Sequence, residues 1–335
     1  MDIFDSLAIP YFKCRKYFNR GWGPLSYLQE VNPPEKIELS EISQTVPDIH
    51  WDKPRISRNV LVSDGKFKTT SQYTRLPHQS SVTYIRKIAP IGTINENPTL
   101  LIHFPGTGDS GYQFREHYYA RPLAQHGITS ILLQSPYYGI RKPNYQSGTR
   151  LSTVIDLLLL GACSIEEGRS LLCYGQQKGY KHLAVTGVSR GGFIAAIAAS
   201  ITPLPVAIST QIAGLSISKA FTDGIIKHLC NWKNLANELP LDFDYTGDKT
   251  ELVRSKLTEI LSITDIANYP LPEKVKAAII TGARNDQVIS PQTVLDLHQY
   301  WKGSELRWLP GGHVSSIMFK GSNFRKAIFD SIERL

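Results

Sequence analysis

The chain has 335 residues, of which 41% are hydrophobic and 20% charged, as in an ordinary soluble globular protein. No stretch approaches the 18 uninterrupted apolar residues of a membrane-spanning helix, and the N-terminus lacks the apolar core of a secretory signal. Four cysteines without C-x-x-C spacing are too few for a disulfide scaffold, so we expect reduced thiols. The net charge of +8 is modest for this length and does not identify a nucleic-acid binder.

The N-terminal part, residues 1–95, is expected to form an arm and a set of opening strands. Residues 11–23 interleave aromatic side chains with lysines and arginines. Such a segment either lies at a membrane surface or packs its rings on the protein core. Pro10 and the glycines of RGWG disfavour a long amphipathic helix and favour the packed arm, with peripheral membrane contact as the alternative. Alternating patterns then predict antiparallel strands at 58–63, 66–73 and 82–89.

The rest of the chain, residues 96–335, alternates apolar strands with helices. Strands are expected at 99–104, 128–134, 182–186, 205–214, 276–282 and 304–309, and helices at 113–126, 151–175, 192–200 and 315–333. This alternation predicts an α/β fold with a mostly parallel central sheet flanked by helices on both faces. Residues 215–270 follow no strand pattern and are expected to be a helical cap insertion. We expect one structural domain overall.

The sequence G-x-S-x-G at 187–191 lies between the strand 182–186 and the helix 192–200. This placement is typical of the nucleophile elbow of serine hydrolases, where small flanking residues allow a very tight turn. Ser189 is therefore the predicted nucleophile, and the backbone N–H of Arg190 would face a developing oxyanion. An incidental glycine turn is the alternative.

A second glycine-rich loop, PGTGDSG, follows the strand 99–104. It matches a dinucleotide fingerprint, but no acidic residue ends the next strand to bind a ribose. It also contains the G-D-S-G of trypsin-like proteases, which are all-β proteins. We expect instead that Thr107 or Gly108 supplies the second oxyanion N–H. A merely tight turn between strand and helix is the alternative.

Two further polar residues follow the last two predicted strands. Asp286 comes just after the strand 276–282, and His313 lies in a glycine-rich loop after the strand 304–309. The order Ser, Asp, His is the one that this fold class requires, so His313 is the predicted base and Asp286 its partner. Asp265 and Glu273 are less favoured acids because both precede the strand. His103, at the end of the strand 99–104, is expected to line the site.

The loop 136–143 should face the same edge of the sheet, because it follows a parallel strand. Tyr137, Tyr138, Arg141 and Lys142 are therefore candidate substrate contacts. With Arg190 they would form a cationic rim that favours acidic substrates. The alternatives are a surface turn stiffened by two prolines, and an Arg190 that pairs with a neighbouring acid.

Several motifs resemble the abhydrolase-domain-containing-protein-eighteen family: RGWG (20–23), PGTGD (105–109), ARPLA (120–124), PYYGIRKP (136–143) and TGVSRGG (186–192). The resemblance implies an α/β-hydrolase fold and serine-dependent hydrolysis of lipid or other acyl esters. Arg190 departs from the family's usual pattern, in which the residue after the nucleophile is uncharged.

Together these features predict a serine hydrolase that cleaves an ester or thioester through an acyl-enzyme, with no cofactor and no metal. Its partner would be a small acyl substrate, and no nucleic acid is expected. We expect a cytoplasmic location, with membrane association as the alternative. An inactive hydrolase-fold protein that binds acyl ligands is the rival function. A dinucleotide-dependent oxidoreductase is disfavoured.

Overall fold

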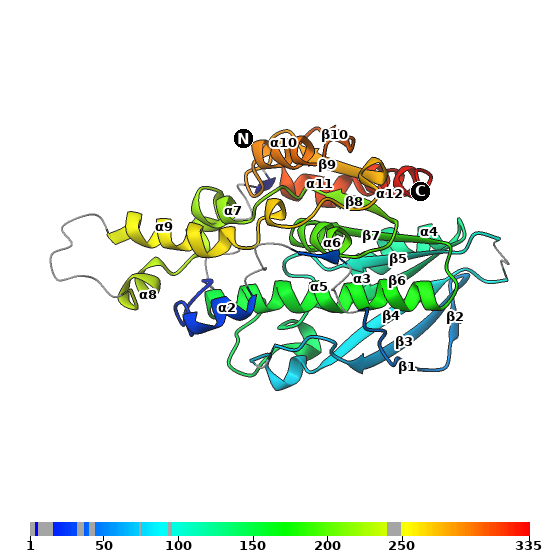
Figure 1. Cartoon of the computed structure of the whole chain (residues 1–335), viewed down its shortest axis with the longest axis horizontal. Helices are drawn as coiled ribbons and strands as arrows, with labels where there is room; N and C mark the ends of the chain where they lie inside the picture. The colour runs from blue at the N-terminus through cyan, green and yellow to red at the C-terminus, as the bar shows by residue number, and fades with distance from the viewer. Residues whose placement is uncertain are drawn as a thin grey trace.

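The computed structural model describes residues 4–5, 16–31, 37–39, 44–73, 75–92, 96–239 and 249–335. In these residues the centre is one mixed ten-stranded sheet (Figure 1). The strands are β1 (His50–Trp51), β2 (Arg55–Ser57), β3 (Val60–Lys68), β4 (Val82–Ala89), β5 (Thr99–Phe104), β6 (Ile128–Leu133), β7 (His182–Val188), β8 (Val206–Gln211), β9 (Ala278–Ala283) and β10 (Glu305–Leu309).

The order of strands across the sheet is β1-β3-β4-β6-β5-β7-β8-β9-β10, with β2 paired to β3. Strands β5 to β10 pair in parallel, and the pairs among β1 to β4 are antiparallel. β4 joins the two parts through an antiparallel pairing with β6. The predicted mostly parallel sheet with antiparallel opening strands is therefore confirmed.

Helices cover both faces of the sheet. The α-helices are α2 (Leu28–Val31), α3 (Gln113–Arg115), α4 (Arg121–Ala124), α5 (Val154–Gln177), α6 (Arg190–Ser200), α7 (Ser218–Thr222), α8 (Trp232–Asn237), α9 (Lys249–Ser262), α10 (Pro291–Tyr300), α11 (His313–Phe319) and α12 (Gly321–Ile332). Apolar residues of α5, α6 and α10 share one core cluster, and those of α12 and of the segment before β6 share another on the opposite face.

The short helical turns are η1 (Leu25–Tyr27), η3 (His78–Ser80), η4 (Glu116–Ala120), η5 (Gly139–Arg141), η6 (Ile225–Leu229), η7 (Ile266–Asn268) and η8 (Val275–Ala277). Of these, η4 is a π-helical segment that joins α3 directly to α4, so the predicted helix 113–126 is one continuous helical stretch over residues 113–124. The predicted helix 315–333 is instead two helices, α11 and α12. The long predicted helix 151–175 is α5, which begins at a capping box between Thr153 and Asp156.

The opening strands differ from the prediction. The expected strands 58–63 and 66–73 are one continuous strand, β3, because Asp64 and Gly65 do not form a turn. The Trp51 ring covers the space that a side chain at Gly65 would occupy. The turn lies earlier, at Arg58 and Asn59, whose φ angles of 49° and 61° join β2 and β3 in a tight hairpin.

The insertion 215–270 is helical, as predicted: between β8 and β9 it forms α7, η6, α8, α9 and η7. α8 and α9 lie beyond the sheet at one end of the molecule (Figure 1). Residues 240–248 are outside the described residues.

The described part of the N-terminal arm is packed against the core. Tyr17, Phe18 and Trp22 are buried, and the Trp22 indole N–H donates to the carbonyl oxygen of Leu235 in α8 at 2.8 Å. This agrees with the packed-arm interpretation for residues 16–23. Residues 11–15 are outside the described residues, so a membrane contact there stays a prediction.

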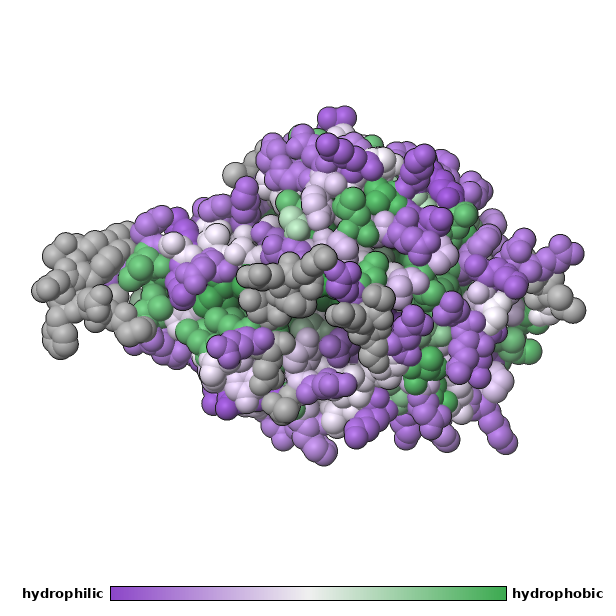
Figure 2. Space-filling view, viewed as in Figure 1, coloured by the Kyte–Doolittle hydropathy of each residue, from purple (hydrophilic) through white to green (hydrophobic). Residues whose placement is uncertain are grey.

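Hydrophilic residues cover most of the face seen in Figure 2, and hydrophobic residues form smaller patches between them. Among the described helices, none combines the length and the apolar character needed to cross a lipid bilayer.

Candidate active site

Ser189 lies on a strained corner between β7 and α6. Its φ of 57° and ψ of −124° are rare for a residue with a side chain. The corner requires glycine on both sides: a Cβ on Gly187 would be 2.2 Å from the Gly191 carbonyl carbon, and one on Gly191 would be 2.4 Å from the Phe104 carbonyl oxygen. The backbone N–H of Arg190 lies in the first turn of α6, where N–H groups have no acceptor within the helix.

His313 and Asp286 are joined by a hydrogen bond. His313 Nδ1 donates to Asp286 Oδ2 at 2.7 Å, and both side chains are buried. The other carboxylate oxygen, Oδ1, accepts the N–H groups of Val288 and Ile289 at 2.8 and 2.7 Å. The Asp286 carboxylate is thus fixed by the turn after β9. With Nδ1 bound to this carboxylate, His313 Nε2 forms no hydrogen bond with the other residues that the structure describes.

The pKa of His313 is raised above its usual value. Burial alone would lower this pKa, but the charge of Asp286 and its hydrogen bond oppose burial and outweigh it, with a smaller contribution from the charge of Asp5. The imidazolium form of His313 is therefore stabilised where it lies.

Ser189 and His313 line the same cavity, which has a volume of about 700 Å³. Gly106, Thr107 and Gly108 line it as well. Most of the remaining wall is apolar and comes from Phe104, Phe114, Ile225, Ile226, Leu229, Val288 and Ile317. The Ser189 hydroxyl makes no hydrogen bond to any other described residue, as is common for such groups when no substrate is bound.

The side chain of Arg190 points away from the cavity and holds the glycine-rich loop. Its Nη2 donates to the Gly106 carbonyl oxygen at 3.0 Å. The described peptide bonds are all trans, and in a trans peptide the C=O and the following N–H point in opposite directions. The N–H of Thr107 therefore points away from Arg190, and it donates to no other described residue.

A family model described as alpha/beta hydrolase domain containing 18 matches residues 15–250 and 244–334. The chain belongs to this family.

Solved structures similar to this family member include esterases and a lipase. Acetyl xylan esterase 1 from a Thermoanaerobacterium species is 15% identical with a TM-score of 0.55, over 95% of this chain and 98% of that chain. An acetyl xylan esterase from a Paenibacillus species is 16% identical with a TM-score of 0.56, over 91% and 98%. Candida antarctica lipase A in its closed state is 12% identical with a TM-score of 0.57, over 90% and 85%. At these identities the likeness shows the fold alone, and the predicted α/β-hydrolase fold is confirmed.

In this family member the four loop residues predicted to contact substrate do not line the cavity. Arg141 is fully buried, and its guanidinium pairs with Glu167 and donates to the Gln134 carbonyl oxygen at 2.7 Å. Tyr137 and Tyr138 are also fully buried. The Lys142 ammonium donates to the carbonyl oxygen of Gln146 in its own loop. The interpretation of these residues as substrate contacts, and of a cationic rim built from them, is corrected accordingly.

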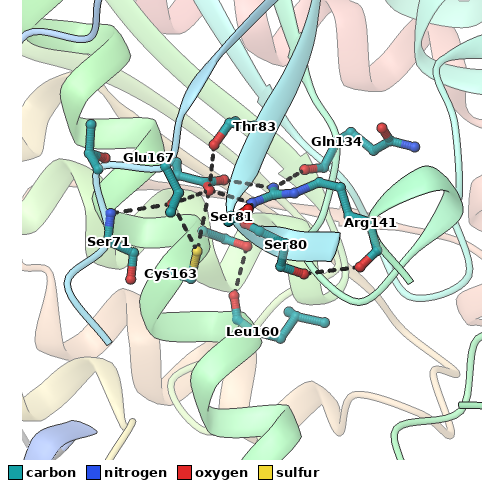
Figure 3. A network of polar contacts seen from close by, with 12 residues as sticks. Ser71, Ser80, Ser81, Thr83, Gln134, Arg141, Leu160, Cys163 and Glu167 are labelled. Carbon is teal, nitrogen blue, oxygen red and sulfur yellow. Dashed lines mark hydrogen bonds and ion pairs between the residues drawn. The ribbon is translucent and has the colours of Figure 1, made fainter. Parts of the chain in front are cut away.

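Figure 3 shows why Arg141 lies inside the protein. Glu167 on α5 accepts hydrogen bonds from Thr83, Cys163 and Arg141, and the Arg141 carbonyl oxygen accepts one from Ser80. Through its ion pair with Glu167 and its bond with Ser80, Arg141 anchors the loop after β6 to α5 and to the segment before β4. Arg141 therefore has a structural role in holding this loop in place.

His103 does line the cavity, as expected, but its ring is fully buried and Nε2 bonds to Ser130 Oγ at 3.0 Å. Burial and the nearby charge of Arg115 lower its pKa well below the usual value, so the ring is neutral.

Two other residues at the cavity were not predicted from sequence. Arg115 braces the glycine-rich loop through Asp109 at 2.5 Å, and the buried Asp5 contacts the start of α11. Nothing in the residues around Asp5 indicates this role.

Proposed function

We propose that this chain is a serine hydrolase that cleaves an ester or thioester through a covalent acyl-enzyme. The observation that supports this most directly is that Ser189, on a strained elbow, lines one cavity with a His313 already paired to Asp286. A nucleophile, a base and a group that orients the base are the parts that acyl transfer needs.

In the proposed reaction, His313 Nε2 takes the proton of Ser189 as Oγ bonds to the acyl carbon. The carbonyl oxygen becomes an oxyanion, held by the N–H groups of Arg190 and of Thr107 or Gly108. Collapse of this intermediate breaks the bond to the leaving group, which takes the proton from His313. A water molecule, activated by the same histidine, then hydrolyses the acyl-enzyme and restores Ser189.

The shape and lining of the cavity support an acyl ester with a substantial apolar part. The wall is built mainly of apolar side chains from β5, the helix after it, and η6 of the insertion. A cavity of about 700 Å³ is within the range of small-molecule sites. Lipid or other acyl esters are the substrate class that we propose.

The test combines a covalent probe with a substrate series. A fluorophosphonate probe is expected to label the wild type and not Ser189→Ala. Hydrolysis of p-nitrophenyl esters, measured from short to long chains, should fall at least about 10³-fold in Ser189→Ala. Binding of a fatty acid without any Ser189-dependent turnover would overturn the proposal and favour an acyl-ligand binding protein. Equal labelling of both proteins would also overturn it.

A further inference from the structure

Asp5 is a buried carboxylate that lines the cavity and is not one of the groups of the proposed reaction. It is 1% exposed. Its Oδ1 accepts the N–H of Val314 at 2.8 Å, and its Oδ2 accepts the N–H groups of His313 at 3.0 Å and Gln287 at 3.2 Å. Both oxygens of this buried carboxylate therefore have backbone donors as partners.

These three donors come from the two segments that carry the proposed acid and base. Gln287 directly follows Asp286, and His313 and Val314 begin α11. Gly312, the residue before α11, has no side chain to cap the helix, so Asp5 supplies the missing cap. One carboxylate thus joins the turn of Asp286 to the first turn of the His313 helix.

The neighbouring residue strengthens the attachment. The Phe4 ring packs edge-on against Phe319, the last residue of α11, with ring centroids 5.5 Å apart. Phe4 and Asp5 therefore contact opposite ends of this seven-residue helix. α11 depends for its position on a segment about 300 residues away in the chain.

Asp5 also acts on His313 through charge. The charged groups that raise the pKa of His313 are Asp286, on the turn after β9, and Asp5, from the N-terminal segment. The Asp286 carboxylate bonds to the ring, whereas Asp5 bonds to the backbone. Asp5 therefore affects the His313 ring in two ways: it fixes the position of the His313 backbone, and its charge acts on the ring through space. It does not contact the reacting atoms.

We infer that Asp5 is a positioning residue that holds His313 against Asp286 and sets the pH range in which His313 can act as a base. This inference rests on the proposed function. It assigns to the N-terminal segment a role in the reaction that neither the elbow nor the loop motifs indicate.

The experiment compares Asp5→Asn and Asp5→Ala with the wild type and with Asp52→Asn, which removes one exposed carboxylate beside β1. Asparagine keeps an acceptor oxygen but loses the charge. In Asp5→Asn the acid limb of the kcat/KM profile should therefore move to lower pH, because His313 loses a nearby negative charge. Asp5→Ala should show the same movement and a plateau kcat lower by about ten- to a hundredfold, with KM little changed. Asp52→Asn should match the wild type.

A second measurement, the pKa of the His313 ring, does not require the protein to be catalytically active. The His313 ring is titrated by NMR in the wild type and in Asp5→Asn, with its signal assigned by its absence in His313→Gln. Its pKa should be lower in Asp5→Asn than in the wild type. A merely structural role for Asp5 would lower the melting temperature but leave the acid limb and the ring titration in place.

The two proposals can fail separately. If the wild type shows no Ser189-dependent hydrolysis but the ring titration moves in Asp5→Asn, the proposed function fails and the coupling of Asp5 to His313 stands. If the wild type hydrolyses esters through Ser189 but both Asp5 variants keep its pH profile and its kcat, the inference about Asp5 is overturned.

Discussion

The guanidinium of Arg190 donates to the carbonyl oxygen of Gly106 at 3.0 Å, so one residue connects the elbow to the glycine-rich loop. The same guanidinium donates to the Tyr138 hydroxyl at 2.9 Å and lies over the Tyr138 ring. Among the described residues it forms no ion pair with an acid, which corrects the alternative that Arg190 pairs with a neighbouring carboxylate. The backbone N–H of Arg190 is itself one proposed oxyanion donor. Its side chain binds the carbonyl oxygen of Gly106 and so orients the next peptide N–H, that of Thr107, which is the other proposed donor.

Arg190→Met should lower kcat by about ten- to a hundredfold and change KM little, because the Gly106 peptide loses the bond that orients the Thr107 N–H. Arg190→Lys, which keeps one donor, should fall between the wild type and Arg190→Met. Steady-state kinetics on one p-nitrophenyl ester measure both effects. Unchanged kcat in Arg190→Met, in a protein that remains folded by circular dichroism, would contradict this role of the side chain.

The pH profile should follow His313. Protonated His313 cannot accept the Ser189 proton, so kcat/KM should fall as the pH decreases through a pKa above the usual histidine value.

Asp286→Asn should reduce kcat by on the order of 10³- to 10⁴-fold, because the imidazolium loses its partner. Asp265→Asn provides the control, since Asp265 lies before η7 and does not line the cavity. Equal losses in the two variants would argue against Asp286 as the acid.

The pair of Arg141 and Glu167 should be a stability determinant. Removing one partner leaves the other charge buried, so Arg141→Met or Glu167→Gln should each reduce the free energy of unfolding by about 3–5 kcal/mol. The double variant Arg141→Met with Glu167→Gln should lose less than the sum of the two single losses. Urea denaturation measures these values, with Lys142→Met as a control expected to change stability by less than about 1 kcal/mol. Strict additivity would contradict a coupled pair.

Asp265 should destabilise the folded protein at neutral pH. Burial raises its pKa from 3.8 to about 6, and its buried Oδ1 has no hydrogen-bond partner among the described residues. The folded state therefore holds a proton more tightly than the unfolded chain, and stability is lost as the pH rises from about 4 through about 6. Asp265→Asn should have a higher melting temperature than the wild type at pH 8 and a similar one below pH 4. A difference that does not depend on pH would rule out this explanation.

The parallel half of the sheet could be predicted closely from sequence, because buried strands are short apolar runs bounded by turn residues. β5 lies at its predicted residues, and β7 extends the predicted strand by two. The opening strands were harder, because Asp64 and Gly65 have the composition of a turn. In the structure both residues pair with β4, opposite Arg86 and Ile85, and the Trp51 ring packs over Gly65.

In the candidate site, too, some features could be predicted from sequence and others could not. Ser189, Asp286 and His313 could be placed because each follows a strand, and the strand ends of a parallel sheet meet at one edge. His313 was expected in a loop and instead begins α11, because its cap comes from Asp5, 308 positions away. The burial of Arg141 could not be predicted either, since its partner Glu167 lies on α5 and a charged loop residue is usually exposed.

The arm at residues 16–22 fixes how the cavity can open. Tyr17 exchanges backbone hydrogen bonds with Leu229 and Asn231 of the insertion, and Phe18 donates to Leu151 of the core. An insertion tied to the core in this way cannot swing as a rigid lid unless several buried hydrogen bonds break together. We therefore expect ligands to pass by side-chain rotations at the rim, which occur in picoseconds to nanoseconds, and not by a hinge motion that takes microseconds to milliseconds.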